Sequence, residues 1–302
     1  MVILDSLITK AASKTDPVVS VASAADLEVL EAVNLAITKG IATFLLFDDE
    51  IRLQELLASN FPHLLVHDKV SIHHAEDEFQ ASKLAVKAVS SGKAHVVMKG
   101  NVATSIILKA VLNSEYGLRS GKILSHVAAF EVAGYDRLLF VTDAAMNIAP
   151  DLEAKAQIIR NAVGTAHACG VVEPIVAPLA AIETVNPAME PTTDAASLVV
   201  MNKRGQITGC IIDGPLALDN AISEQAAAQK GITSNTAGKA DILVVPNIES
   251  GNILYKSLMY FAGAKVGAII QGATAPIVLT SRADSAESKL YSLALAILAI
   301  KQ

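Results

Sequence analysis

Short apolar runs rich in β-branched residues alternate with segments of helical length along the whole chain. The pattern begins with VVSVASA at residues 18–24, continues with a helical segment over 25–39 that ends at Gly40, and returns to an apolar run, IATFLLFD. Buried strands separated by helices of about 10 to 15 residues are typical of parallel sheets with right-handed crossover connections. We therefore predict an α/β protein whose sheets are mostly parallel and covered by helices on both faces.

The chain has 302 residues, which exceeds the usual size of one domain and predicts two. Counting the expected elements places the change of domain near residues 135 and 136, where RLLFVTDAAMNIAP opens a second set of units. Further helices are expected over residues 49–59, 77–91, 104–113, 151–168, 192–202 and 216–230. Further strands are expected at residues 64–66 and in the runs AHVVMKG, ILSHVAAFEV, RLLFVTD, EPIVAPLA and ITGCIID.

The amino-acid composition restricts which side chains can form the core and which partners the protein can bind. Apolar residues make up 52% of the chain and aromatic residues only 4%, without Trp, so the core must be aliphatic. The formal net charge is −6, and basic residues do not interleave with aromatic ones, so nucleic acid is not an expected partner. Cys169 and Cys210 lack metal-ligand spacing and are predicted to be buried thiols in a reducing cytosol.

The two ends of the chain predict neither export nor membrane insertion. The N-terminal MVILDSLITKAAS lacks the basic region and the sustained apolar run of a signal peptide. The C-terminal LYSLALAILAIKQ is too short to cross a bilayer of about 30 Å as a helix. We therefore expect a buried C-terminal helix and a cytoplasmic protein that does not bind membranes.

The stretch over residues 241–289 carries the strongest indication of a functional site. An apolar strand over 242–245 ends at Pro246, a polar loop carrying Gly251 follows, and a helix is expected from Ile253. A strand over 266–270 stops at Gln271 and Gly272, and another over 276–280 is followed by Ser281 and Arg282. Ligands of open α/β sheets bind outside the carboxyl ends of the strands, which is where these loops begin.

Arg282 at such a strand end is suited to an oxyanion, above all phosphate, because the planar guanidinium matches its oxygens. Asp284 is expected to cap the following helix, with Glu287 reaching back to it. Ser281 has no histidine in its loop, so it is expected to donate a hydrogen bond to a carbonyl oxygen or oxyanion. Alternatively, Arg282 is a surface residue paired with Asp284 or Glu287.

Several common catalytic signatures are missing from the sequence. The phosphate-binding motifs GxxxxGK[ST] and GxGxxG do not occur, and neither does the GxSxG nucleophile motif. The pairs His73/His74 and His63/His67 lack carboxylates at ligand spacing, so no metal site is expected. His126 is expected in the core.

Polar and charged residues also follow other predicted strands. Asp143 and Asp213 stand at strand ends, where they either cap helices or line a cleft. Three cationic residues lie beyond the strand that ends in Lys99 and Gly100, namely Lys109, Arg119 and Lys122.

Seven segments together resemble one known family. They are MKGNVATS, GLRSGKILSHVAAF, TDAAMNIAP, VNPAMEPTTDAA, GQITGCIIDGPLALDNAIS, TAGKADILVVPNIESGNILYK and IIQGATAPIVLTSRADS. The chain resembles the phosphate acetyl/butyryl transferase family, and most closely its phosphate butyryltransferase (phosphotransbutyrylase) branch. The resemblance covers residues 99–289 with specific motifs and extends more loosely toward the N-terminus.

The resemblance implies a fold, a reaction and partners. The fold would be two α/β domains of the isocitrate/isopropylmalate-dehydrogenase type with the active site in the cleft between them, and the assembly a homodimer. The domains would comprise residues 1–135 with 273–302, and residues 136–272. The reaction would be acyl-CoA plus inorganic phosphate giving acyl phosphate plus CoA on a short acyl group, with coenzyme A as a substrate and no cofactor.

Carried over by motif, Ser281 and Arg282 match the family's catalytic pair, in which the arginine binds phosphate and the serine stabilises the carbonyl oxygen. Gly251, Asn252 and Lys256 belong to the GNxxYK segment, which lines the cleft.

Further residues join the candidate substrate site. Lys109 stands where acetyl-specific relatives carry an arginine, and Arg119 is a second candidate for phosphate or for the phosphates of CoA. Gly272 belongs to the matching segment before Ser281.

One position departs from the family pattern. Acetyl-specific relatives carry an aspartate seven residues after the catalytic serine, proposed as the base for the CoA thiol, and this chain has Ser288 there. Asp284 is our candidate for the base, and Glu287 is an alternative.

Three other functions remain open. The acyl group could be acetyl or branched, because an apolar pocket separates substrates by only about 1–3 kcal/mol per methylene. A metal- and NAD-dependent decarboxylating dehydrogenase would share the fold, but needs clustered aspartates that this sequence lacks. A non-catalytic sensor of CoA or acyl phosphate is the third.

Overall fold

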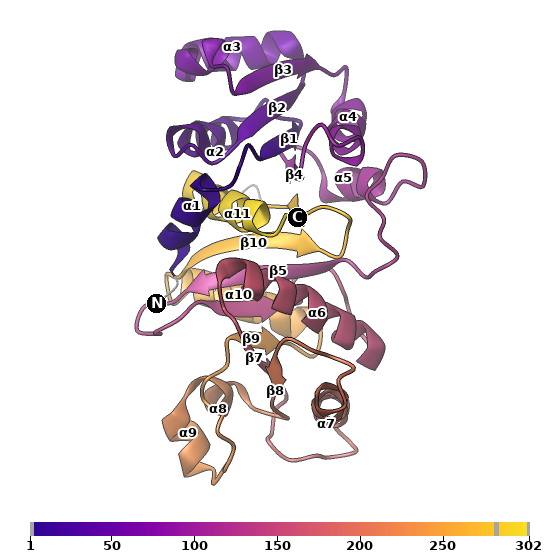
Figure 1. Ribbon diagram of the computed structural model, residues 1–302, viewed down its shortest axis with the longest axis vertical. Coiled ribbons are helices and arrows are strands. Elements are labelled where there is room, and N and C mark those ends of the chain that lie inside the picture. Colours follow the sequence, from indigo (N-terminus) through magenta and orange to yellow (C-terminus); the bar gives the residue numbers. More distant parts are fainter. Residues whose placement is uncertain (1–2, 281–283, 301–302) are drawn as a thin grey trace. The chain divides into compact units, whose positions relative to one another are not determined.

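The computed structural model describes residues 3–280 and 284–300 (Figure 1). Their contacts divide the chain into two compact units, which we call the first unit (residues 4–122 and 267 onward) and the second unit (residues 123–266, with Ile3). Each unit is an α/β fold with mostly parallel strands, as predicted. The proposed domains, which change at residues 135/136 and 272/273, stay a prediction.

In the first unit, strands lie in the order β3-β2-β1-β4-β11-β10, and all neighbours are parallel except β10 and β11. Every residue of β4 is buried, which explains why its sequence, VVMK, has consecutive apolar residues and not alternating apolar and polar ones. The strands are β1 (Val18–Ala22), β2 (Thr43–Asp48), β3 (Val70–His74), β4 (Val96–Lys99), β10 (Lys265–Gln271) and β11 (Ile277–Val278).

Helices cover both faces of this sheet (Figure 1). In one layer, α11 contacts both α1 and α2. In the other, α4 packs on β1 and β2 and contacts α5. The helices predicted over 25–39, 49–59 and 77–91 are confirmed, and Asp26, Asp49 and Asp77 cap them, because each carboxylate accepts a backbone N–H of the first turn. The helices are α1 (Leu4–Ala12), α2 (Leu27–Thr38), α3 (Glu50–Asn60), α4 (Glu78–Ser90), α5 (Thr104–Val111) and α11 (Ala286–Leu298).

In the second unit, strands lie in the order β5-β6-β9-β7-β8, with β5 and β6 antiparallel and the remaining pairs parallel. The strands are β5 (Ser125–Glu131), β6 (Leu139–Thr142), β7 (Ile175–Pro178), β8 (Ile211–Ile212) and β9 (Ile242–Val244). The helices are α6 (Leu152–Cys169), α7 (Glu190–Lys203), α8 (Leu218–Ile222), α9 (Glu224–Gln229) and α10 (Ile248–Tyr260).

The core is aliphatic, as composition predicts. The C-terminal helix α11 is buried along its whole second half, which confirms the buried-helix prediction for this segment.

Cys169 and Cys210 are both buried and form no disulfide, and burial raises the pKa of Cys210 to about 11, with Glu173 adding to the shift. No helix in the described part of the chain is both long and apolar enough to cross a membrane.

Two elements predicted from the sequence are wrong, because a proline in one and a capping serine in the other override the hydrophobic pattern. Residues 64–66, predicted as a strand, belong to a 3₁₀ helix over Pro62–Val66 that starts with proline. The helix predicted over 216–230 breaks at Ser223, whose extended backbone ends α8 and whose hydroxyl accepts the N–H of Ala226 to begin α9.

Two helix starts near the predicted site are also corrected. Helix α10 begins at Ile248 rather than Ile253, because Asn247 caps it, so Gly251 lies in a helix and not in a loop. Helix α11 is capped by Ser285, which accepts the N–H of Ser288, and not by Asp284. Strand β11 is also shorter than the predicted 276–280.

Gly251 allows α10 to pack against the end of β6. A Cβ at this position would lie 2.7 Å from Asp143 O, 2.8 Å from Val245 Cγ2 and 2.9 Å from Ala144 Cα. Two of these neighbours are backbone atoms, which cannot move aside without shifting the loop. The first turn of α10 therefore requires glycine.

We expect Gly251→Ala to lower the free energy of unfolding by about 1–3 kcal/mol, because the added methyl group overpacks this contact. The matched control is Gly164→Ala in α6, where a Cβ would have no heavy atom of the described residues within 4 Å apart from its own helix backbone and chain neighbours. That control should raise stability by up to about 1 kcal/mol, as replacing a helical glycine by alanine does. Urea denaturation measures both, and equal stability of Gly251→Ala and wild type would contradict the packing argument.

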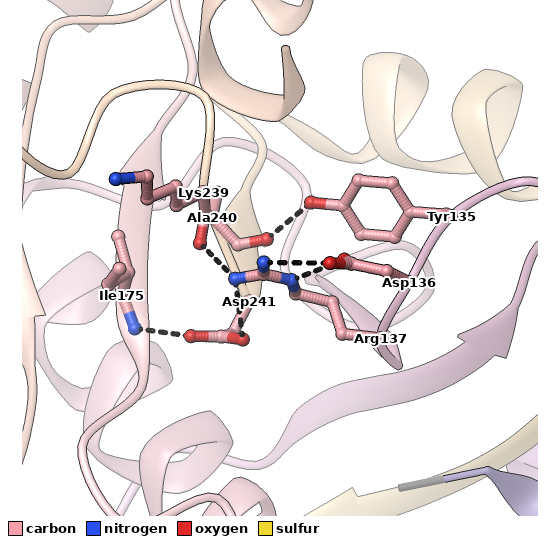
Figure 2. A network of polar contacts seen from close by, with 7 residues as sticks. All are labelled: Tyr135, Asp136, Arg137, Ile175, Lys239, Ala240 and Asp241. Atoms are coloured by element: carbon pink, nitrogen blue, oxygen red, sulfur yellow. Dashed lines mark hydrogen bonds and ion pairs between the residues drawn. The ribbon is translucent and has the colours of Figure 1, made fainter. Parts of the chain in front are cut away.

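A polar network fastens the segment before β9 to the turn between β5 and β6 (Figure 2). Arg137 binds Asp136 (Nε to Oδ1, 2.8 Å), donates to Lys239 O (3.1 Å) and lies 3.8 Å from Asp241. Asp241 accepts the N–H of Ile175 (2.8 Å), which brings in the start of β7. The network therefore joins three strands at their amino ends.

The Tyr135 hydroxyl completes this network by donating to Ala240 O (2.9 Å). Burial raises the pKa of Tyr135 from 10.0 to about 12, an effect that Arg137 opposes and the carboxylates of Asp241 and Asp136 support. Between those two pH values the folded protein keeps a proton that the unfolded chain releases. This contribution to stability is therefore complete below pH 10 and is lost as the pH rises toward 12.

Tyr135→Phe should remove that part of the pH dependence, so the difference in unfolding free energy between wild type and variant should shrink from pH 10 to pH 12. Below pH 10 the variant should be less stable by about 1 kcal/mol for the lost hydrogen bond. Denaturation at several pH values measures this, with the exposed Tyr260→Phe as control. Parallel curves for Tyr135→Phe and wild type would refute the assignment.

Candidate functional site

The carboxyl ends of β1, β4 and β11 lie side by side in the first unit. The strands are parallel neighbours, with Ala22 opposite Lys99 and Val278 opposite Met98. Thr280 follows β11 and is buried. Ser281 and Arg282 come next in the chain and lie outside the described residues, so their predicted roles stay predictions.

The end of β4 approaches β1 more closely than a side chain would allow. The N–H of Gly100 donates to Ala22 O (2.8 Å) and that of Asn101 to Ser23 O (2.7 Å). A Cβ on Gly100 would lie 2.1 Å from Ser23 O. Ser23 itself has φ +55°, a backbone conformation that is uncommon outside glycine, and its buried hydroxyl makes no hydrogen bond to any residue that the structure describes. The strand end is therefore tightly constrained.

Lys99 brings a positive charge into this edge of the sheet. Its side chain is buried, with 5% of the residue's surface exposed, and its ammonium donates to Gly100 O (3.2 Å) and, more distantly, to Thr280 O (3.5 Å). The second of these contacts joins the end of β4 to the residue that precedes Ser281.

The candidate base Asp284 is half-buried, and its backbone carbonyl accepts a short hydrogen bond from the ammonium of Lys289. Ser288, at the place of the expected aspartate, is bound to Ser285 through its N–H and hydroxyl, both at 3.2 Å. The Glu287 carboxylate accepts from the Tyr291 hydroxyl (3.0 Å). Ser285 thus takes the capping place that the sequence assigned to Asp284 and Glu287, which corrects that prediction.

Arg119 and Gly272 lie in two loops that the structure ties together. The N–H of Thr274 donates to Leu118 O (2.9 Å), and the Ser120 hydroxyl makes a short hydrogen bond to Gly272 O. Gly272 adopts φ +100°, which favours glycine. The exposed Arg119 therefore stands between two anchoring bonds to the loop that leads from β10 to β11.

Lys109 lies elsewhere in the first unit. It is exposed on α5 and lines a hollow of about 370 Å³ between α4 and α5, together with Phe79, Lys83 and Tyr116. The Lys83 and Lys87 ammonium groups stand 5.8 and 5.6 Å from the centroid of the Tyr116 ring, at cation–π distance. The lining of the hollow thus combines the cationic Lys83 and Lys109 with the Asp77 carboxylate and the Tyr116 ring.

In the second unit, Asn252 and Lys256 are exposed one turn apart on α10 and so share one helix face. Lys256 lies 5.8 Å from the Tyr255 ring centroid and 5.9 Å from that of Tyr260. Tyr255 in turn meets His126 edge-on at 5.8 Å, and His126 is buried, which confirms its predicted place in the core.

The two strand-end aspartates hold loops in place. The carboxylate of Asp143 accepts the N–H groups of Ala145, Met146 and Asn147 at 2.9 to 3.2 Å. That of Asp213 accepts the hydroxyls of Ser234 and Thr236 at 2.5 and 2.7 Å. Neither carboxylate caps a helix, since the N-cap residues of the helices that follow are Asp151 for α6 and Ala217 for α8, so the helix-capping prediction is wrong for both.

The predicted site residues that the structure describes thus fall into four groups: Asp284 before α11, Arg119 with Gly272, Lys109 in its hollow, and Gly251, Asn252 and Lys256 on α10. Sequence reasoning did not single out Lys99 and Lys289, although both are buried and contact the carbonyl groups of Thr280 and Asp284. In the sequence, Lys99 could have been recognised because it directly follows a run of apolar residues, VVM, that is typical of a buried strand.

Comparisons with known proteins bear on the family and the fold. A family model described as phosphate acetyl/butaryl transferase matches residues 54–297. A probable phosphate butyryltransferase of Bacillus subtilis (strain 168) is 58% identical over 299 residues, which cover 99% of this chain and 98% of that protein. The crystal structure of a branched-chain phosphotransacylase from Enterococcus faecalis V583 matches with TM-score 0.83 and 37% identity, over 94% of this chain and 99% of that one.

A more distant likeness bears on the fold alone. A 4-hydroxythreonine-4-phosphate dehydrogenase from Klebsiella pneumoniae matches with TM-score 0.56 and 11% identity, over 95% of this chain and all of that one. The predicted dehydrogenase-like α/β fold is therefore confirmed. With a family model that matches most of its length and a relative of high identity over nearly all of it, the chain belongs to the phosphate acetyl/butaryl transferase family.

Proposed function

We propose that the protein transfers a short acyl group between coenzyme A and inorganic phosphate, in the reaction acyl-CoA + phosphate = acyl phosphate + CoA. The observation that carries this proposal is the match to the family over residues 54–297, which includes the strand end before Ser281 and Arg282. The buried ammonium of Lys99, at the end of the neighbouring strand β4, supports the proposal, because both phosphate and acyl phosphate are anions.

The chemistry needs no covalent enzyme intermediate. The CoA thiolate attacks the acyl carbon of the acyl phosphate, and the C–O bond to phosphate breaks as the C–S bond forms. Negative charge collects on the carbonyl oxygen, where Ser281 would donate a hydrogen bond, while Arg282 would bind the phosphate. Holding both substrates in one site supplies much of the remaining rate enhancement.

A base for the CoA thiol completes the proposal. A thiol with a pKa near about 8.5 needs only a modest base near neutral pH. Asp284 is the candidate that we favour, because it lies one helical turn before Ser288 in the sequence and Ser288 cannot accept a proton near neutral pH. The proposal requires no metal or cofactor.

Exposed polar residues supply the remaining contacts to the substrates. Lys109 and Arg119 in the first unit and Asn252 and Lys256 in the second are exposed and would contact phosphate or the phosphates and pantetheine of CoA. Gly251 and Gly272 contribute backbone: the first lets α10 pack closely, and the second shapes the loop beside Arg119.

We favour butyryl as the acyl group, because the relative with 58% identity is a probable phosphate butyryltransferase. Acetyl and branched-chain groups are the alternatives, since the family includes acetyl transfer and a structural relative is a branched-chain phosphotransacylase.

The proposed compartment is the cytoplasm, and the buried thiols of Cys169 and Cys210, which form no disulfide, agree with a reducing environment.

The proposed assembly is a homodimer that buries part of α10. Ile253, Tyr260 and Phe261, on this helix and at its end, are exposed at 66%, 74% and 91%. Large apolar side chains gathered on one exposed element are typical of a surface that another chain covers. A second copy is the partner most often found for such a surface.

Arg282→Ala should lower phosphate-dependent release of free CoA at least about a hundredfold, roughly 3 kcal/mol in the barrier, because it removes the phosphate ligand. The assay uses acetyl-, butyryl- and isovaleryl-CoA, of which butyryl-CoA should have the highest kcat/KM. Arg52→Ala, which removes an exposed arginine of α3, should keep the wild-type rate.

Different outcomes of this assay contradict different parts of the proposal. No CoA release by the wild type with any substrate would overturn the transferase, and equilibrium CoA binding would then test a sensor. Wild-type rates in Arg282→Ala would leave the reaction in place and refute the phosphate site. A preference for another acyl-CoA would refute only the choice of butyryl.

For the assembly, we expect sedimentation velocity to give a dimer for the wild type and a monomer for Phe261→Glu. A charge at this position would be buried without a partner on association. The control is Ile51→Glu on α3, which is also exposed (69%) and should remain a dimer. A dimer of unchanged stability in Phe261→Glu would exclude this surface.

A further inference from the structure

A buried carboxylate organises the loop that follows β6 in the second unit. Only 3% of Asp143 is exposed, and its Oδ1 accepts the N–H groups of Ala145 and Met146, both at 2.9 Å. Its Oδ2 accepts the backbone N–H of Asn147 (3.2 Å) and the side-chain amide of the same residue (2.6 Å). Both carboxylate oxygens therefore bind donors within the next four residues of the chain.

These bonds limit what Asp143 can do. A buried carboxylate is unfavourable unless hydrogen bonds or a cation replace its lost hydration, and here four uncharged N–H donors do so. Because the residue is almost wholly buried, its carboxylate does not reach a substrate on the surface. Any effect of Asp143 on function must therefore pass through the loop that it holds.

The loop is also tied to the start of β5. The side-chain amide of Asn147, which binds Asp143, donates in addition to Leu124 O (2.8 Å). The strand end of β6, the loop and the first residues of β5 thus form one hydrogen-bonded group, which gives the loop a fixed place in the second unit.

The same loop fixes the beginning of α10. Ile148 O accepts the N–H of Ile248, the first residue of the helix (2.9 Å). Three residues later, a Cβ on Gly251 would lie only 2.7 Å from Asp143 O. A hydrogen bond and a close backbone contact therefore join the loop to the first turn of α10.

The two candidate substrate contacts of α10 follow directly after this turn. Asn252 is the next residue after Gly251, and Lys256 lies one turn further along; both are exposed. Backbone hydrogen bonds hold successive turns of a helix together, so a shift of the first turn moves both side chains. Neither side chain contacts Asp143, which acts on them only through the backbone.

We propose that Asp143 is a positioning residue that, through the loop over residues 143–148, sets where α10 holds Asn252 and Lys256 against a substrate. This inference rests on the proposed transferase function, in which those two side chains bind phosphate or coenzyme A. A misplacement of about 1 Å can cost on the order of a hundredfold in rate. A loop tied by four hydrogen bonds to one carboxylate limits such movement.

The test measures CoA release from butyryl-CoA while the concentrations of butyryl-CoA and phosphate are varied in turn. Lys256→Ala identifies which of the two KM values depends on α10, and should raise it at least fivefold. Asp143→Asn should raise the same KM at least fivefold and leave kcat within threefold of wild type. The amide nitrogen of the asparagine is itself a donor, so at one of the two oxygen positions it would face the N–H groups of the loop and release them.

A background without both contacts separates positioning from stability. In the double variant Asn252→Ala/Lys256→Ala, Asp143→Asn should raise that KM less than twofold further, because the side chains that it positions are already missing. A residue with a purely structural role would lower the melting temperature and leave both KM values unchanged.

Asp241→Asn is the matched control. Asp241 is also a buried aspartate of the second unit (9% exposed) and accepts a backbone N–H, that of Ile175, but it precedes β9, whereas α10 follows that strand. The control should lower the melting temperature and leave both KM values within twofold of wild type. Where Asp143→Asn does not give a cooperative melt, Gly251→Ala takes its place, since the added methyl group displaces α10 from the same loop.

The outcomes separate the two proposals. Turnover by Asp143→Asn with both KM values within twofold of wild type would overturn the positioning role and leave the transferase intact. Full additivity of Asp143→Asn with the Asn252→Ala/Lys256→Ala pair would also overturn it, as would unchanged KM values in Lys256→Ala. A wild type without turnover would overturn the function and this inference together.

Discussion

The close approach of β4 to β1 is the contact on which the candidate site depends. The N–H of Gly100 reaches Ala22 O and the N–H of Asn101 reaches Ser23 O, so the two strands stay paired one residue past their ladder. Only glycine fits there, because a Cβ would overlap Ser23 O. With β4 fixed in this way, Lys99 is held at the edge of the sheet, and the carbonyl of Thr280 lies within its reach.

The local charge of this edge differs from that of the whole chain. The protein carries a formal net charge of −6, yet buried ammonium groups lie beside the strand end and the following helix. Local charge matters more than net charge for an anionic substrate, because interactions among buried groups are screened far less than those at the surface. Attraction of phosphate would then depend on a few fixed cations and not on the overall field of the protein.

Much of the fold followed from the sequence, and the failures have common physical causes. Apolar runs located most strands, and the helices over 25–39, 49–59 and 77–91 follow from their patterns because Asp26, Asp49 and Asp77 cap them. At α10 and α11, neighbouring polar residues compete for the same cap, and tertiary packing decides between them. Sequence pattern cannot detect the burial of Lys289, since a lysine on an amphipathic helix normally faces water. The roles of Ser281 and Arg282 come from family resemblance.

The order of elements along the chain has a consequence for synthesis of the protein. The second unit is one nearly continuous segment, whereas the first unit joins residues 4–122 to a segment that starts at 267. Strand β11, the neighbour of β4, and helix α11, which contacts α1 and α2, are therefore synthesised only after the whole second unit. Until β11 is made, the edge of β4 that pairs with it has no neighbouring strand. The nascent first unit therefore has an exposed strand edge that a chaperone would have to protect.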